Sequence, residues 1–382
     1  MQNNVLSQPR FEILDGLRGV AALMVVIFHI SEAFSYDPVY KHINHGFLAV
    51  DFFFVLSGFV IGYAYDNRLE SGRMSVGQFL KNRLIRLQPM VLFGLIFGFL
   101  LFYFQDCDYY PRIAETGLST LLLYVVLNFF MIPQTPAYNI RGNEELFSLN
   151  IPQWSLIYEY IANLLYVLFV HKLGKVGLSI LVTVFTVTQI DCALTQNWFG
   201  LLQEHEYPWS LNAGFTWNVE HFYIGMSRVC FSFFAGLLLN RIGRYIHVKA
   251  AFWWCSLIII AVFCTENVGG YEHPLWDGLF NLLCTLIVFP LVVCMGAGGR
   301  LTDSRSIALC NFMGRISYSL YLVHYPIVYL FFSWMDTHRN APLDMIIVAT
   351  LSVIIMSIAL AYAAMRLYDE PVRAWLKKVT KS

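Results

Sequence analysis

The chain has 382 residues, of which 58% are hydrophobic and only 13% carry a charge. A soluble domain has roughly 25% charged residues, so the composition excludes a water-soluble protein of this size. The formal net charge is zero, no basic tract or nucleic-acid motif occurs, and no CxxC or Cys/His cluster is present. We therefore expect no nucleic-acid partner and no metal ion.

The apolar residues gather in eleven blocks, each close to the roughly 20 residues that a helix needs to cross a bilayer. The blocks cover residues 17–34, 47–65, 90–104, 117–132, 154–171, 174–190, 222–240, 250–265, 278–297, 313–334 and 343–366. The first block contains Arg18 and His29 and no small-residue cleavage site follows it, so we expect a retained helix, not a signal peptide. Residues 1–382 are expected to form a single membrane domain in the lipid bilayer.

The distribution of basic residues predicts how the blocks cross. The loop at 66–89 is the most basic segment, and the positive-inside rule places it in the cytoplasm together with the N-terminus. If all eleven blocks crossed, the later basic loops would lie outside; if one block before residue 154 does not cross, they return inside. The block at 117–132 is short and contains Asn128, which favours a re-entrant segment. We predict an all-α protein with ten transmembrane helices, one re-entrant segment and both termini cytoplasmic.

Two ionisable residues in the first block indicate function. A charged side chain within a spanning helix costs roughly 2.5–3.5 kcal/mol, so it is a functional candidate by default. Arg18 and His29 are eleven residues apart, which places them on one helix face about 16 Å apart along the axis. This geometry suits a long anionic ligand that enters from the cytoplasm, such as coenzyme A with its pantetheine arm. The alternatives are an interfacial anchor for Arg18 and a helix-packing hydrogen bond for His29, whose tautomer Glu32 could hold.

The second block contributes Asp51 near its outer end, where the carboxylate could orient an imidazole or an acceptor hydroxyl, or simply lie in the interface. Ser57 and Gly58 form a small-residue patch that allows a helix or a ligand to approach closely, although core packing alone would explain it. Arg83 and Arg86, three residues apart before the third span, could bind phosphates bidentately or act only as positive-inside determinants.

Later blocks carry further polar side chains. Glu159 follows Trp154 into the fifth block, and Arg228 at a similar depth is its expected partner. Ser317, Tyr321 and His324 recur at intervals of four and three residues, so this stripe must face protein or water, not lipid. The residues expected to line the path of the substrates are Ser57, Trp154, Arg228, Tyr321 and His324.

Taken in order, these motifs resemble acyltransferase family 3, the bacterial membrane O-acyltransferases that modify surface and secreted glycans. The resemblance covers nearly the whole chain. It is carried by Leu14-Asp15-Gly16-Leu17-Arg18-Gly19, Phe53-Phe54-Val55-Leu56-Ser57-Gly58-Phe59, Arg83 with Arg86 and Pro89, Trp154-Ser155-Leu156 with Glu159, Ser317-Tyr318-Ser319-Leu320-Tyr321-Leu322-Val323-His324-Tyr325-Pro326, and Glu370-Pro371.

The resemblance implies a ten-helix domain in the bacterial inner membrane that moves an acyl group, commonly acetyl, from cytoplasmic acyl-CoA to an acceptor outside. His29 would be the catalytic histidine, and Arg18, Arg83 and Arg86 would hold the donor. The expected acceptor is a surface polysaccharide, a lipopolysaccharide or an exopolysaccharide precursor. Many members carry an extra esterase-like domain; this chain ends soon after its last span and resembles the stand-alone members. A lysosomal relative that N-acetylates glucosamine leaves an amine acceptor open.

The expected mechanism uses His29 as a base on the sugar hydroxyl, with Asp51 or Glu159 orienting the imidazole; a covalent acyl relay on His29 is the competing version. The chief rival function is a proton- or ion-coupled transporter, because buried His, Arg and Glu residues also build ion relays. We see no internal repeat of the kind that many transporters have. A scaffold or receptor would leave the intramembrane charges unexplained.

Overall fold

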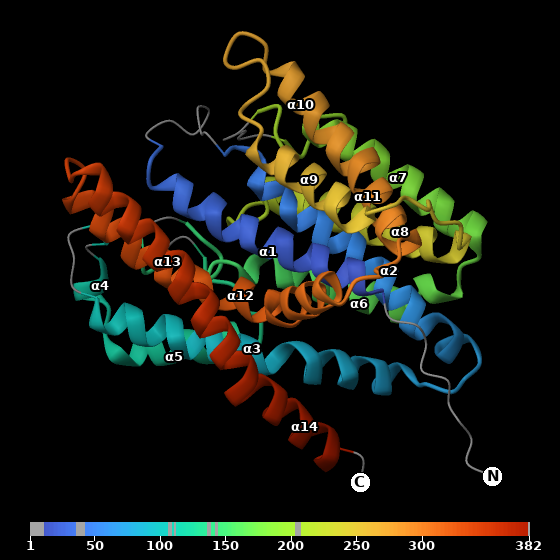
Figure 1. Cartoon of the computed structure of the whole chain (residues 1–382), viewed down its shortest axis with the longest axis horizontal. Coiled ribbons are helices and arrows are strands. Elements are labelled where there is room, and N and C mark those ends of the chain that lie inside the picture. The colour runs from blue at the N-terminus through green and yellow to red at the C-terminus, as the bar shows by residue number, and fades with distance from the viewer. Residues whose placement is uncertain are drawn as a thin grey trace.

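The computed structural model describes residues 11–35, 43–105, 109–110, 112–135, 139–141, 144–202 and 208–380, and their regular structure is helical (Figure 1). The helices are α1 (Glu12–Glu32), η1 (His45–Leu48), α2 (Ala49–Glu70), α3 (Val76–Phe104), α4 (Arg112–Glu115), α5 (Leu118–Phe129), α6 (Gln153–Leu168), η3 (Val170–Lys172), α7 (Lys175–Ala193), α8 (Val219–Ile242), α9 (Ala251–Cys264), α10 (Leu275–Leu282), η4 (Leu283–Val288), α11 (Phe289–Gly298), α12 (Ser304–Thr337), α13 (Leu343–Ala364), η5 (Met365–Asp369) and α14 (Glu370–Val379). The prediction of an all-α protein is confirmed.

Eight helical segments among the described residues are long and apolar enough to cross a membrane, and they match eight of the ten predicted spans. The segments are Glu12–Glu32, His45–Glu70, Val76–Phe104, Lys175–Ala193, Val219–Ile242, Leu275–Gly298, Ser304–Thr337 and Leu343–Val379. The other two predicted spans correspond to α6 and α9, which have 16 and 14 residues, and their crossing stays a prediction. Helix α5 has 12 residues, about 18 Å, which is short of the roughly 30 Å hydrocarbon core.

Two helices begin well before the predicted spans that they contain, because polar capping residues start them ahead of the apolar blocks. Helix α3 starts at Val76, where Ser75 and Gln78 form a capping box that satisfies two backbone N–H groups. Helix α12 starts at Ser304, where the carboxylate of Asp303 accepts the N–H of Ser306 at 2.7 Å, and this bonding lowers the pKa of Asp303.

The C-terminal end of α5 is held by side chains from other helices. The amide of Gln153 donates to the carbonyl of Asn128 at 3.3 Å, and the amide of Gln88 donates to the carbonyl of Phe129. The last carbonyls of a helix have no partner within the helix, and at membrane depth protein groups have to supply one. The predicted block at 117–132 thus ends inside protein surroundings.

Glycines allow the helix pairs of the core to approach closely. A Cβ on Gly58 of α2 would collide with the carbonyl oxygen of Phe233 in α8, and a Cβ on Gly236 would collide with the carbonyl oxygen of Val55. Helices α1 and α12 meet in the same way, because a Cβ on Gly19 would collide with the backbone of α12. Small residues at such crossings are typical of membrane helix packing.

Helix α12 continues through Pro326, which has no N–H to offer to the carbonyl of Leu322. The side-chain amide of Asn150 donates to this carbonyl instead, at 2.8 Å, so the residues that precede α6 are tied to the middle of α12. This arrangement holds the two polar segments, before α6 and along α12, against each other.

Candidate active site

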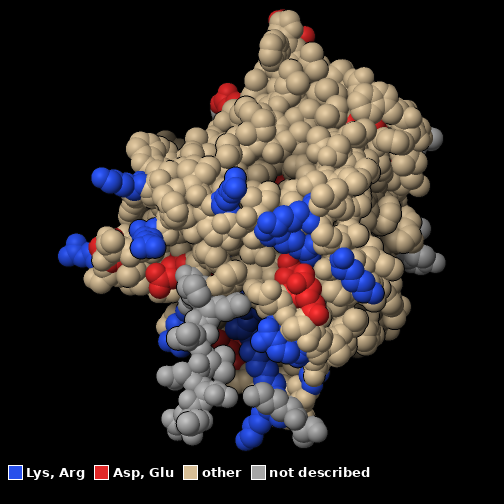
Figure 2. All heavy atoms as spheres, turned by 90° about the vertical axis from the view of Figure 1, so that its right-hand side faces the viewer, with Lys and Arg blue, Asp and Glu red and all other residues tan. Residues whose placement is uncertain are grey.

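A cavity of about 400 Å³ lies between α1, α2, α3, α6 and α12. The lining includes three arginines, Arg18, Arg83 and Arg86, and two carboxylates, Asp15 and Glu159. Figure 2 shows the side of the molecule where α2 is joined to α3; Lys and Arg side chains gather there, and a recess in this basic face has further basic side chains inside it. An anion that approaches this face therefore meets positive charge both outside and within the recess.

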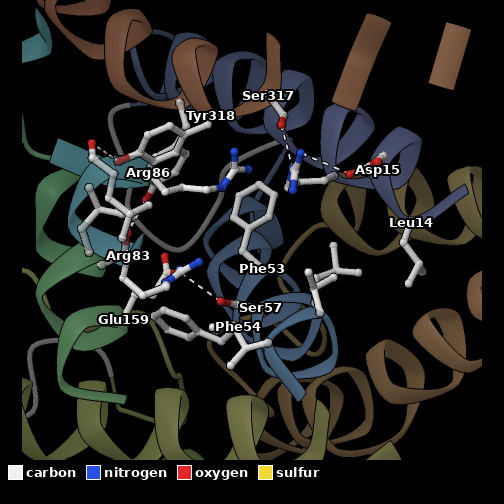
Figure 3. A pocket seen from close by; sticks show the side chains of 18 of the residues that line it. Leu14, Asp15, Phe53, Phe54, Ser57, Arg83, Arg86, Glu159, Ser317 and Tyr318 are labelled. Carbon is white, nitrogen blue, oxygen red and sulfur yellow. Dashed lines mark hydrogen bonds and ion pairs between the residues drawn. The ribbon is translucent and has the colours of Figure 1, made fainter. Parts of the chain in front are cut away.

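Arg83 is paired with Glu159 across α3 and α6. Its Nη2 lies 2.6 Å from Oε1 of Glu159, and the hydroxyl of Ser57 donates to the same oxygen at 2.9 Å (Figure 3). The expectation that Glu159 pairs with Arg228 is wrong, because α6 presents this carboxylate to α3. The cavity thus keeps Arg83 and Glu159 side by side as a neutral pair.

Arg18 is fixed to α12 at the opposite side of the cavity. Its Nε donates to the hydroxyl of Ser317 at 2.8 Å, its Nη2 donates to the carbonyl of Gly314 at 2.7 Å, and Asp15 lies 3.4 Å from Nη2. These contacts hold the guanidinium in one orientation, which favours planar, bidentate recognition of a phosphate.

Arg86 differs from the other two arginines because it makes no hydrogen bond or ion pair with any residue that the structure describes. Its side chain has a large accessible surface and points into the cavity, toward the space beside Phe53 (Figure 3). A guanidinium that points into a cavity and has no counter-ion among the described residues has its N–H donors available for a ligand. The cavity therefore fits an anionic ligand.

Two hydroxyls meet deep in the cavity. The hydroxyl of Tyr321 on α12 and that of Ser155 on α6 are 2.7 Å apart, and both residues line the cavity. The sequence prediction that Ser317, Tyr321 and His324 face protein or water is confirmed, since their exposed fractions are 2%, 8% and 0%. This stripe leads from the arginines toward the middle of α12.

His29 and His324 meet beyond the cavity lining. Their rings are stacked with centres 5.5 Å apart and planes 23° apart, and Tyr325 contacts His29 edge-on at 4.6 Å. Nδ1 of His29 lies 2.8 Å from the carboxylate of Glu32, so Nδ1 is the donor, and in the neutral ring Nε2 then has the lone pair. A carboxylate, an imidazole and a free Nε2 form the arrangement of a general base.

Asp51, Arg228 and Trp154 form a separate buried cluster. Nη2 of Arg228 lies 2.7 Å from Asp51 and also donates to the carbonyl of Phe47, Nη1 donates to the carbonyl of Ala213, and Trp154 packs against the guanidinium at 5.5 Å. Both charged side chains are almost completely buried, at 1% and 0% exposure. The expected contacts of Asp51 or Glu159 with His29 are absent among the described residues; Glu32 takes that place.

The structure thus brings the predicted residues together in three groups. Arg18, Arg83, Arg86, Ser57, Glu159 and Tyr321 line the cavity; His29 and His324 form the imidazole pair; Asp51, Arg228 and Trp154 form the buried cluster. Sequence reasoning did not identify Tyr325 or Ser155 as members of the site. Both lie within motifs that were recognised, next to His324 and Trp154, so the motifs carried a signal for them.

Comparisons with known proteins agree with this chemistry. A protein of Rhizobium radiobacter called protein 2 in the picA locus is 36% identical over 164 residues, 41% of this chain and 81% of that protein. The O-acetyltransferase OatA of Staphylococcus aureus is 22% identical over 376 residues, 94% of this chain and 57% of that protein. The chain thus spans little more than half the length of OatA. No solved structure matches the chain.

A family model described as an acyltransferase domain matches residues 11–366, which include every residue of the cavity and of the imidazole pair. Because the match extends over nearly the entire sequence, the chain belongs to acyltransferase family 3.

Proposed function

We propose that this chain is a membrane O-acyltransferase that moves an acyl group, in the first instance acetyl, from cytoplasmic acyl-CoA to a hydroxyl of a cell-surface or exported carbohydrate. The observation that carries the proposal is the cavity, into which the fixed Arg18 and Arg86 both point, and Arg86 has no partner in the described part of the chain. The named activity of OatA supports transfer to oxygen.

The donor site matches the chemistry of coenzyme A. Guanidinium groups bind phosphates through paired N–H donors, and two arginines from different helices suit a diphosphate. The apolar lining, with Phe53 and Phe54, suits the uncharged pantetheine arm. The polar stripe of α12 then leads the thioester toward the histidines, about 16 Å from Arg18 along α1.

The acceptor half of the site is built on His29. Its Nε2 takes the proton of the attacking hydroxyl, and Glu32 stabilises the imidazolium that forms. A hydroxyl is so weakly acidic that it needs this base, whereas the thiolate of coenzyme A leaves readily.

The proposed setting is the cytoplasmic membrane of a bacterium. Residues 1–382 work as one membrane domain with ten crossings, α5 as a re-entrant helix and both termini cytoplasmic. The side-chain partners of the α5 carbonyls support this topology, as do the basic residues gathered at the α2–α3 side. A reporter fused after Glu145 is expected to read outside; a cytoplasmic signal there would contradict the re-entrant assignment.

The function is tested by deleting the gene and measuring ester-linked acyl groups on surface and exported glycans. We expect the deletion to remove a class of esters, and the wild-type gene to restore it. The variant His29→Ala should restore none, while the matched control His338→Ala, a histidine at the end of α12, should restore it fully. Unchanged glycans in the deletion strain would reject the function. Full restoration by His29→Ala, at equal protein level in the membrane, would reject the role of His29.

A further inference from the structure

His324 has a free nitrogen at the centre of the molecule. Its ring has no exposed surface, and its Nδ1 lies 3.0 Å from the carbonyl of Leu320 one turn before it. A carbonyl only accepts, so Nδ1 carries the hydrogen and Nε2 has the lone pair. This Nε2 has no hydrogen-bond partner among the residues that the structure describes. A buried polar atom without a partner is costly, so its retention in a tightly packed core requires an explanation.

His324 contacts both the cavity residue Tyr321 and His29. Arg18 reaches α12 at Ser317, and His324 follows Ser317 by seven residues, or about 10 Å along the helix. His29 follows Arg18 by eleven residues, or about 16 Å. The side chain of Arg18 reaches forward along α12, however, because Gly19 packs on the backbone of Met313, so His29 and His324 lie at nearly the same level, as their stacked rings show. The cavity residue Tyr321 is already in contact, with its ring centre 6.1 Å from that of His324.

The two imidazoles have different hydrogen-bond partners, a carboxylate for His29 and a backbone carbonyl for His324. One proton leaves the acceptor hydroxyl per turnover, and His29 with Glu32 is sufficient to take it. A second unprotonated imidazole, with no carboxylate among its hydrogen-bond partners, is not needed as a base. A neutral Nε2 is a good nucleophile toward a thioester, and burial protects an acyl-imidazole from hydrolysis by water.

We propose that His324 is the acyl carrier of this enzyme: it takes the acyl group from the donor in the cavity and presents it to the acceptor activated by His29. The proposal rests on the proposed function. In the first step Nε2 of His324 attacks the thioester carbon, the C–S bond breaks, and the thiolate leaves into the cavity. The acyl-imidazolium keeps its Nδ1–H on the carbonyl of Leu320.

In the second step the acceptor hydroxyl attacks the acyl carbon while Nε2 of His29 takes the hydroxyl proton. The C–N bond breaks, the ester forms, and neutral His324 is restored with its lone pair. The imidazolium of His29 then gives its proton to the thiolate, which leaves as free coenzyme A. Atoms and charges balance with only the thioester and the hydroxyl as reactants.

The Tyr321–Ser155 hydrogen bond marks the passage between the cavity and His324. Both residues line the cavity, and the ring of Tyr321 lies against that of His324, with the ring centres 6.1 Å apart. In the proposed first step the thioester passes Tyr321 to reach His324.

The test is an isotope exchange in the absence of acceptor, with the purified full chain in lipid nanodiscs, acetyl-CoA and labelled free coenzyme A. An acyl carrier makes the first step reversible, so label enters acetyl-CoA although no acceptor is present. We expect wild type, the control His338→Gln and His29→Gln to exchange within about fivefold of one another. His324→Gln should lose exchange at least 100-fold while it still binds coenzyme A.

Three outcomes would overturn the proposal that His324 carries the acyl group. These are no exchange by a wild type that transfers acetyl to its acceptor, undiminished exchange in His324→Gln, or equal loss in both histidine variants. If His324→Gln does not bind coenzyme A, rapid quenching and peptide mapping of His29→Gln decides: acetyl on His324 supports the proposal, and acetyl on another residue rejects it. A wild type that neither exchanges nor acylates glycans would instead reject the proposed function itself.

Discussion

Replacing Arg86 by glutamine should weaken donor binding without changing the chemical step. Arg86 faces the cavity with no partner in the described structure, so its removal leaves no buried carboxylate exposed and the fold is unaffected. A hydrogen bond to a charged group contributes about 1.5–3 kcal/mol, and 1.4 kcal/mol is a factor of ten. We therefore expect the Kd for coenzyme A to rise about 10- to 150-fold, with kcat at saturating donor within about threefold of wild type.

The assay is isothermal titration of the purified full chain with coenzyme A and, separately, with pantetheine, which has no phosphate. Arg86→Gln should lose affinity for coenzyme A and keep its affinity for pantetheine. The matched control is Arg68→Gln, an exposed arginine on the same basic face that does not line the cavity. Equal affinities of the two variants for coenzyme A would refute the phosphate site, and so would an equal loss of pantetheine binding.

Three further predictions concern residues around the cavity. Glu32→Gln should lower kcat about 10²- to 10⁴-fold at unchanged Kd for the donor, because His29 loses the carboxylate that stabilises its charged form; kcat within threefold of wild type would contradict this role. Asp51→Asn should destabilise the protein by about 3–5 kcal/mol, since it leaves Arg228 buried without a counter-ion, and thermal unfolding in detergent measures the loss. Gly58→Ala should lower the melting temperature through overpacking against α8, whereas Gly77→Ala, at an exposed position of α3 where a Cβ meets nothing within 4 Å, measures the effect of the same substitution in a helix without a close contact; equal shifts would reject the close contact.

The helices of this fold could be predicted from sequence because a helix that crosses the hydrocarbon core needs a continuous run of roughly 20 apolar residues. Eight predicted spans coincide with helices of sufficient length and hydropathy. The starts of α3 and α12 could not be found in this way, since Ser75 and Asp303 begin polar turns that hydropathy does not detect. Capping signals were present in the sequence at both places.

Residues that share a helix were also predicted well, whereas pairs between helices were not. The interval of eleven residues placed Arg18 and His29 on α1, and the polar stripe of α12 is buried as expected. Depth in the membrane, however, does not say which helices are neighbours. Glu159 and Arg228 were matched by depth, yet the close packing of α2 on α8 gives Arg228 to Asp51 instead.

The ion pair of Glu159 with Arg83 makes a prediction that separates two roles for this carboxylate. Sequence reasoning proposed Glu159 as a group that orients His29, in which case Glu159→Gln should lower kcat. The structure instead places its Oε1 2.6 Å from Arg83, where the carboxylate balances one positive charge of the donor site. Two unit charges about 8 Å apart interact by about 2 kcal/mol at an effective dielectric constant of 20, so removing one negative charge strengthens phosphate binding.

We therefore expect Glu159→Gln to bind coenzyme A several-fold more tightly, to keep kcat within about threefold, and to lose the gain at high salt, where exposed phosphates are screened. Glutamine also keeps an oxygen that accepts the hydroxyl of Ser57. Steady-state kinetics with acetyl-CoA, compared with Glu32→Gln in the same preparation, measures both roles at once. A large loss of kcat in Glu159→Gln with unchanged donor affinity would support a catalytic role for Glu159. It would also contradict the proposal that this carboxylate weakens phosphate binding at the donor site.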